Sequence, residues 1–163
     1  MSKAIYGGRC QTAFNKKWHV TEQLADLDAK SLYPSAIKRL YTVEGVPEVL
    51  NVTNPETIYN SMPDYLKQYD SNDGIGAFVV EIKILKANKH YALPLIVQKT
   101  NEGNRNDDIL TQPVIMVVDN IALEDLIEFQ QIEFQVIKGY VYNGSRDYRC
   151  REFIQNLFDA RVN

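Results

Sequence analysis

Two segments in which apolar and polar residues alternate most constrain the fold of this chain. Residues 77–85 read Ala-Phe-Val-Val-Glu-Ile-Lys-Ile-Leu, and residues 132–143 alternate similarly before the turn signal Asn143-Gly144. Alternation with a period of two is typical of a strand that buries one face. Both segments therefore predict strands of a sheet.

The remaining elements are placed by the same rules. Further strands are expected at 24–28, 93–98 and 113–118, and Pro94 makes the second an edge strand or marks its start. Helices are expected at about 34–40, 121–131 and 147–162. Loops are expected at 1–20 (or a hairpin), over most of 42–75 with a helical turn near 63–69, and at 100–112. This order is no regular strand–helix–strand alternation, so we predict an α+β fold with a largely antiparallel sheet.

Two of the helices carry a readable pattern. Asn120 is the expected N-cap of the helix over 121–131. Its residues at helical spacing are Leu123, Leu126, Ile127 and Gln130. The final helix has an apolar stripe of Cys150, Phe153, Ile154, Leu157, Phe158 and Val162. Both helices are therefore expected to bury one side.

Composition limits the class of protein. The chain has 163 residues, of which 45% are hydrophobic and 24% charged, and its net charge is -3. This length and composition fit one globular domain, with or without a small appendage. The apolar content and the small net charge exclude a mostly disordered chain. No apolar run approaches the roughly 18 residues that span a bilayer, so no membrane partner is expected. The start MSKAIYGG has no apolar core of a signal peptide, and two cysteines make no disulfide framework. We therefore expect a reduced, cytoplasmic protein.

Charge is uneven along the chain. Residues 1–45 carry seven Lys or Arg and four Asp or Glu, whereas residues 46–80 and 111–145 each carry one and five. A basic end of an acidic chain is suited to phosphate. An ordinary solvated surface explains the same pattern, and charge alone favours that reading.

The segment from Asp26 to Ser35 is the most informative for function. An acidic side chain at the end of a strand, followed by a Pro-started helix, places Asp28 beside the N–H groups of the helix entrance. Such N–H groups bind phosphate oxygens, and Mg²⁺ uses carboxylates together with substrate phosphates. Ser31 adds a hydroxyl, and Tyr33 adds a ring that suits a sugar. On the residues alone, an ordinary turn in which Asp28 and Ser31 bond the backbone is favoured over such a site.

The sequence Asp28-Ala29-Lys30-Ser31-Leu32-Tyr33-Pro34 resembles motif A of family B DNA polymerases, D-x-x-S-L-Y-P. Upstream, Ile5-Tyr6-Gly7-Gly8-Arg9-Cys10 resembles the family's Y-x-G-G segment, with Ile5 where an aromatic residue is usual. Downstream, Val117–Asn120, Ile137–Tyr140 and Cys150–Ile154 are similar in order to the protein-primed branch, in which an insertion that contacts terminal protein and template interrupts the palm. The resemblance spans nearly the whole chain.

The resemblance implies roles at the matched positions. Asp28 and the backbone carbonyl of Ala29 would bind the metal, with Mg²⁺ as the cofactor of the parent enzyme, and Asp28 would be a catalytic aspartate. Ser31, with the amides of Leu32 and Tyr33, would hold the triphosphate of a dNTP, and Tyr33 would exclude a ribose 2′-hydroxyl. The remaining matched residues, expected to contact the DNA primer-template, are Tyr6, Gly7, Gly8 and Arg9. The implied reaction is two-metal attack of a primer 3′-hydroxyl on the α-phosphate.

Two further motifs of the family do not occur in the sequence: Y-x-D-T-D, which carries the second catalytic aspartate, and the fingers motif K-x-x-x-N-S-x-Y-G. We therefore expect a fragment that is inactive alone and whose partners include the remainder of the polymerase chain and a terminal protein. The expected parts are a palm segment at 1–45, an inserted terminal-protein-region-like subdomain with the return to the palm at 46–145, and a helix toward the fingers at 146–163. Two alternatives remain open: a non-catalytic module that docks terminal protein or DNA, and a phage or plasmid protein in which motif A is accidental.

Overall fold

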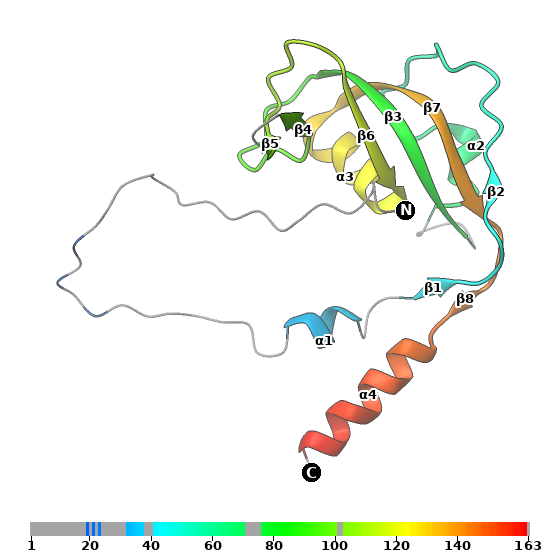
Figure 1. The fold of residues 1–163 in the computed structure, drawn as a ribbon, viewed down its shortest axis with the longest axis vertical. Helices are drawn as coiled ribbons and strands as arrows, with labels where there is room; N and C mark the ends of the chain where they lie inside the picture. Colours follow the sequence, from blue (N-terminus) through cyan, green and yellow to red (C-terminus); the bar gives the residue numbers. More distant parts are fainter. Residues whose placement is uncertain are drawn as a thin grey trace. The chain divides into compact units, whose positions relative to one another are not determined.

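The computed structural model describes residues 19, 21, 23, 32–37, 41–70, 76–100 and 103–162. These residues belong to two compact units (Figure 1). The first is Thr42–Asp147, and the second contains the helices on either side of it in sequence. The predicted strand at 24–28 and the predicted loop or hairpin at 1–20 lie outside the described residues, apart from His19.

A four-stranded antiparallel sheet is the centre of the first unit. Its order is β2 (Glu48–Val49), β7 (Ile132–Tyr142), β3 (Ala77–Ala87) and β6 (Val114–Asp119). The strands β3 and β7 are the two that alternation predicts at 77–85 and 132–143, β6 is the short apolar strand predicted at 113–118, and every pairing is antiparallel. The mixture of helices with antiparallel strands confirms the α+β class.

The inner face of this sheet forms the core. Alternate residues of β3, from Phe78 to Ile84, are fully buried, and so are Phe134 and Val136 of β7. Two helices complete this layer: α3 (Asn120–Gln130), through Leu123 and Leu126, and α2 (Asp64–Lys67), through Leu66. Each such side chain contributes about 1.5–3 kcal/mol on burial, so this core stabilises the unit.

The start of α3 differs from the prediction in its cap. Asp119, not Asn120, is the N-cap: its side chain accepts a hydrogen bond from the Ala122 N–H at 2.8 Å. Asn120 is the first helical residue and is buried. The reason is the tight junction of β6 and α3, which leaves no residue between strand and helix and gives the capping position to the last residue of the strand.

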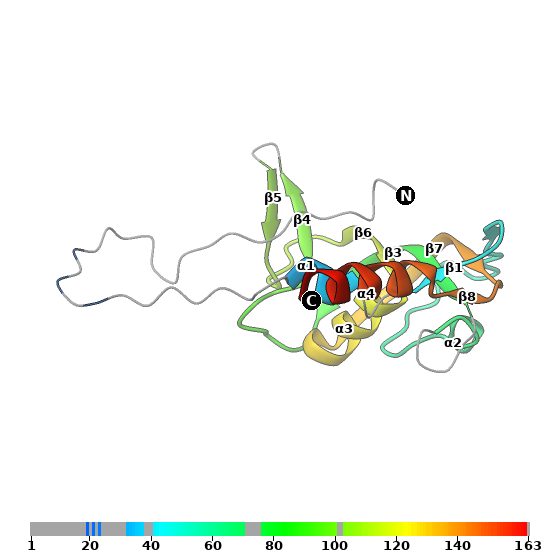
Figure 2. The ribbon, with the colours of Figure 1, turned by 90° about the horizontal axis from the view of Figure 1, so that it is seen from below.

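The segment between β3 and β6 contains a two-stranded ribbon that the sequence prediction misplaced. We call Val97–Asn106 the arm; it pairs β4 (Val97–Thr100) with β5 (Gly103–Asn106). The strand predicted at 93–98 begins only at Val97, and the polar loop predicted at 100–112 contains β5. Residues of β5 are entirely exposed, so the periodicity of burial gives no signal for this strand. Figure 2 shows the arm on the side of the sheet away from α2 and α3.

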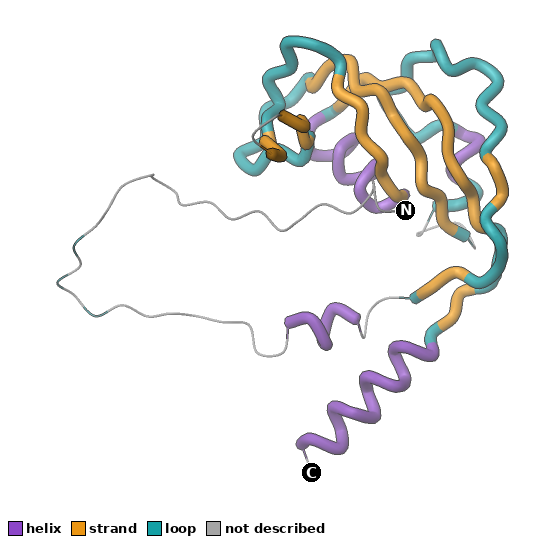
Figure 3. Tube along the Cα trace, in the orientation of Figure 1, coloured by secondary structure: helices purple, strands orange, loops and turns teal. Residues whose placement is uncertain are grey.

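Of the stretch 42–75, the structure describes residues 42–70, which are mostly loop, as predicted, with short helices and strands between the loops. Besides β2, the added elements are β1 (Thr42–Val43), which pairs with β8 (Arg146–Asp147), and α2 close to the predicted turn (Figure 3). Thr42 lies opposite Asp147, so the chain enters and leaves the first unit through neighbouring strands.

The second unit contains α1 (Leu32–Ile37) and α4 (Arg149–Val162), which contact each other. The helix predicted at 34–40 begins earlier, at Leu32, so that Pro34 lies in its first turn, where its missing N–H removes no helical hydrogen bond. The helix predicted at 147–162 begins at Arg149. Of its apolar stripe, Ile154 and Phe158 are half-buried, whereas Phe153 and Leu157 are 63% and 52% exposed.

Candidate functional site

The residues of the predicted nucleotide and metal site lie mostly outside the described part of the chain. Asp28, Ala29 and Ser31 are there, as are Tyr6, Gly7, Gly8 and Arg9. Two predicted site residues are described: Leu32 and Tyr33, the first two residues of α1. The Tyr33 side chain is 81% exposed, so it is accessible to a ligand.

Two tyrosines and an arginine form a cluster at the start of α4, in the same unit as α1. The Tyr41 and Tyr148 rings lie with centroids 6.0 Å apart, and the Arg151 guanidinium stands 5.3 Å from the centroid of Tyr148. A cation over an aromatic face is attracted by the ring's electron density. These contacts hold the start of α4 beside Tyr41.

The described residues hold no group of three or more His, Cys, Asp or Glu side chains that suits a metal ion. The expected Mg²⁺ ligands, Asp28 and the carbonyl of Ala29, lie outside the described residues, so the structure gives no distances for this site. Among the described residues, no helix is long and apolar enough to cross a membrane.

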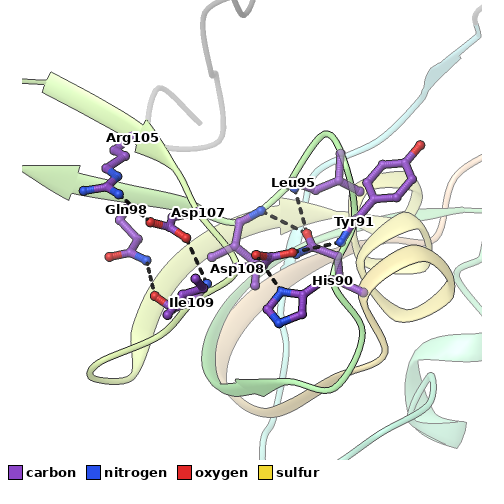
Figure 4. A network of polar contacts seen from close by, with 10 residues as sticks. His90, Tyr91, Leu95, Gln98, Arg105, Asp107, Asp108 and Ile109 are labelled. Atoms are coloured by element: carbon purple, nitrogen blue, oxygen red, sulfur yellow. Dashed lines mark hydrogen bonds and ion pairs between the residues drawn. The ribbon is translucent and has the colours of Figure 1, made fainter. Parts of the chain in front are cut away.

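A network of polar contacts lies in the first unit, at the base of the arm (Figure 4). Asp108 is 9% exposed, and its two carboxylate oxygens have separate partners. The backbone N–H of Tyr91 donates to Oδ2 at 2.9 Å, and Nδ1 of His90 lies 3.1 Å from Oδ1. The N–H of Tyr91, opposed by burial and aided by His90, lowers the pKa of Asp108. The carboxylate therefore stays ionised and fastens the loop after β3.

The neighbouring Asp107 fastens the outgoing strand of the arm. Its Oδ2 forms an ion pair with Arg105 at 2.8 Å, and its Oδ1 accepts the N–H of Ile109 at 2.9 Å. The N–H of Asp107 donates to the carbonyl of Ile96, a buried residue just before β4. Both ends of the arm are thus joined by direct bonds.

A buried glutamine completes this base. Gln130, at the end of α3, has no exposed surface, and its Oε1 accepts the N–H groups of Leu95 and Ile96 at 2.7 and 3.2 Å. The same loop is held by the stacked rings of Tyr91 and Phe129, 5.1 Å apart. The loop before β4 is therefore attached to α3 by the Gln130 side chain, which accepts backbone N–H groups as a neighbouring strand would.

The sequence prediction assigned no role to this network. The one signal was Gln130 itself, an amide at the apolar spacing of its helix, because a buried amide needs a hydrogen-bond partner. Asp107 and Asp108 were part of a predicted polar loop and gave no such signal.

Comparison with protein families gives one match. The family model described as DNA polymerase type B, organellar and viral, matches residues 1–163. No curated protein and no solved structure matches the chain.

Proposed function

Because this chain belongs to the family of organellar and viral type B DNA polymerases, we propose that it supplies one half of a nucleotidyl-transfer site. Members of such a family act on a DNA template with dNTP substrates. The family match over all 163 residues is the main support for the proposal. The motif Asp28–Pro34 is the basis for its location in the chain.

The proposed roles follow the motif. Asp28 binds the divalent cation with the carbonyl of Ala29, the Ser31 hydroxyl and the amides of Leu32 and Tyr33 hold the triphosphate, and the ring of Tyr33 lies against the sugar. The exposure of Tyr33 supports this placement, because a ring packed in a core would be closed to a nucleotide. The segment of Tyr6, Gly7, Gly8 and Arg9 contacts the primer-template.

The 163 residues do not complete the site alone. A two-metal site needs more than one carboxylate, and the sequence has no Y-x-D-T-D motif for the second. The second aspartate belongs to another part of the polymerase, and the divalent cation supplies charge neutralisation at the triphosphate when it is bound.

We also propose that the first unit is the insertion of the protein-primed branch, with terminal protein as a partner. Its support is the separateness of Thr42–Asp147 as a compact unit between the motif A segment and α4. Its ends, Thr42 and Asp147, are paired with each other, as the ends of a unit inserted into another fold must be close together.

The test is dNTP binding by the 163-residue chain in the presence of Mg²⁺, measured by calorimetry. Asp28→Asn is expected to weaken binding at least tenfold, since it removes the charge that holds the cation. The matched control is Asp159→Asn, an exposed carboxylate of α4 whose described contact is with Gln155. Equal binding by wild type and Asp28→Asn would remove Asp28 from the site.

A second measurement tests whether the chain lacks the second metal-binding carboxylate. Primer extension with template, Mg²⁺ and all dNTPs is expected to give no product with the chain alone. Synthesis that disappears in Asp28→Asn would show instead that one carboxylate arm suffices and would overturn the proposal of a divided site.

A further inference from the structure

Among the asparagines of the sequence, Asn143 alone precedes a glycine, Gly144. The backbone nitrogen of the residue after an asparagine closes a five-membered ring when it attacks the side-chain amide carbon. A Cβ on that following residue obstructs the closure, and glycine has none. The pair therefore has the covalent arrangement in which spontaneous deamidation is least hindered.

The structure leaves both reacting groups accessible. Asn143 and Gly144 lie between the last residue of β7 and the first residue of β8, so neither belongs to a strand. Asn143 is exposed. Among the described residues, neither the Asn143 side chain nor the Gly144 N–H has a hydrogen-bond partner. A helix or a strand ladder holds each N–H in a bond and the backbone in one conformation, and neither constraint opposes ring closure at Gly144.

The fold also requires the glycine. A Cβ at Gly144 would overlap the backbone carbonyl group of Glu44. Because backbone atoms cannot move aside as the end of a flexible side chain does, a larger residue is poorly tolerated at this crossing. The close approach of the segments that continue β1 and precede β8 thus imposes the residue that makes Asn143 labile.

We propose that Asn143 is a site of spontaneous deamidation that alters the junction of β7 and β8. The Gly144 nitrogen bonds to the side-chain carbon of Asn143, and the amide nitrogen leaves as ammonia with the proton of the Gly144 N–H. Water then opens the cyclic imide at either carbonyl and gives aspartate or isoaspartate. The reaction needs water alone, and it is independent of the proposed nucleotidyl transfer.

Both products act on the bonds beside β1 and β8. The Glu44 N–H donates to the carbonyl of Ser145 at 2.9 Å, and the Ser145 hydroxyl donates to Oε2 of Glu44 at 3.0 Å. Deamidation of Asn143 places a second carboxylate in this segment, which repels that of Glu44. Isoaspartate also lengthens the main chain by one carbon two residues before Ser145. These two bonds are therefore expected to weaken.

The test is incubation of the complete chain at mildly alkaline pH, followed by proteolysis and mass spectrometry of the peptides. Deamidation raises the mass of a peptide by about 1 Da, and chromatography separates isoaspartate from aspartate. Asn143 is expected to lose its amide at least tenfold faster than Asn51 and Asn156, which are exposed but are followed by valine and leucine. Both serve as controls in the same digest.

The chain unfolded in urea gives the rate that the sequence alone allows. We expect the folded chain to react at Asn143 at a comparable rate, because the structure holds neither reacting group. A folded chain in which Asn143 keeps its amide as long as Asn51, or reacts at least tenfold more slowly than in urea, would overturn the inference.

Amide hydrogen exchange at Glu44 measures the effect on the strand pair. Exchange is expected to become at least threefold faster when wild type is incubated. It should stay constant in Asn143→Gln over the same time, because glutamine would have to close a larger ring. Asn143→Asp has the new carboxylate from the start and should exchange faster than fresh wild type. Unchanged exchange at Glu44 in a chain whose Asn143 has lost its amide would overturn the effect on these bonds.

Discussion

The side-chain oxygen of Gln130 accepts a hydrogen bond from the backbone N–H of Leu95 at 2.7 Å, across 35 positions of sequence. The same oxygen accepts from Ile96, so one buried side chain satisfies two backbone donors. Unsatisfied buried donors are costly, and this makes Gln130 a structural centre of the first unit.

Gln130→Ala is therefore expected to lower the free energy of unfolding by about 3 kcal/mol, from two orphaned N–H groups and a cavity. Chemical denaturation followed by circular dichroism measures the change. Gln68→Ala, at an exposed glutamine, is the control and should stay within about 0.5 kcal/mol of wild type. A loss at Gln130 no larger than this would mean that the N–H groups find other partners.

Gln131 ends α3 in the left-handed region, with φ 47° and ψ 54°. This conformation costs a residue with a Cβ about 1 kcal/mol, and glycine adopts it freely. Gln131→Gly is expected to stabilise the chain by about 0.5–1 kcal/mol in the same denaturation experiment. Glu128→Gly, in the interior of the same helix, should do the opposite and destabilise by about 1 kcal/mol. Destabilisation by both would indicate that Gln131 makes side-chain contacts that outweigh its backbone strain.

Gly139 of β7 pairs with Val80 of β3 and leaves no room for a side chain. A Cβ at this position would stand 2.6 Å from the carbonyl oxygen of Val79 and 2.7 Å from Cγ1 of Val80. Since the first of these is backbone, Gly139→Ala is expected to cost about 2–3 kcal/mol by overpacking. Gly45→Ala tests glycine replacement without crowding, because a Cβ there meets nothing within 4 Å and only its φ of 108° is unfavourable. Equal losses at the two glycines would argue against crowding as the cause.

Asp108 makes the stability of the arm's base depend on pH. The pKa of its carboxyl is lowered from the ordinary value of 3.8, mainly by the N–H of Tyr91. A lowered pKa in the folded state means that the stabilisation is complete above about pH 4 and is lost as pH falls through the lowered value. The stability difference between wild type and Asp108→Asn should be about 1 kcal/mol at neutral pH and shrink in acid.

Amide hydrogen exchange at Tyr91 gives a local measure of the same bond. Exchange should be faster in Asp108→Asn than in wild type near neutral pH, after correction for the intrinsic rate. The His90 side chain is 78% exposed, so His90→Ala is expected to change stability little. A larger loss in His90→Ala than in Asp108→Asn would contradict the dominant role of the backbone bond.

The sequence predicted the elements that bury residues with a regular period. Alternation identified β3 and β7, an apolar run identified β6, and helical spacing identified α3, because a core imposes its pattern on the residues that face it. Helical spacing also identified α4, although Phe153 and Leu157 of its stripe are exposed. The arm gave no such pattern: β5 is exposed on both faces, and the residues before β4 are satisfied by Gln130 rather than by a neighbouring strand.

The candidate nucleotide site was predicted from Asp28–Pro34, and of these residues the structure describes the beginning of α1 alone. The network of Asp107, Asp108 and Gln130 could not be predicted, since the side chains of Asp108 and Gln130 join residues 17 to 35 positions apart. Local propensity contains no information on such pairings.

The pairing of β1 with β8 also affects how the first unit can change without disturbing its neighbours. Thr42 and Asp147 face each other, and the rings of Tyr41 and Tyr148 meet just beyond them. The two ends of the first unit are therefore adjacent, whether the segment between them is long or short. Closing an excursion costs only slowly more entropy as it lengthens. The whole segment from Thr42 to Asp147, more than a hundred residues, can thus be gained, lost or exchanged as one unit. Such a change leaves the path of the chain before Tyr41 and after Tyr148 the same.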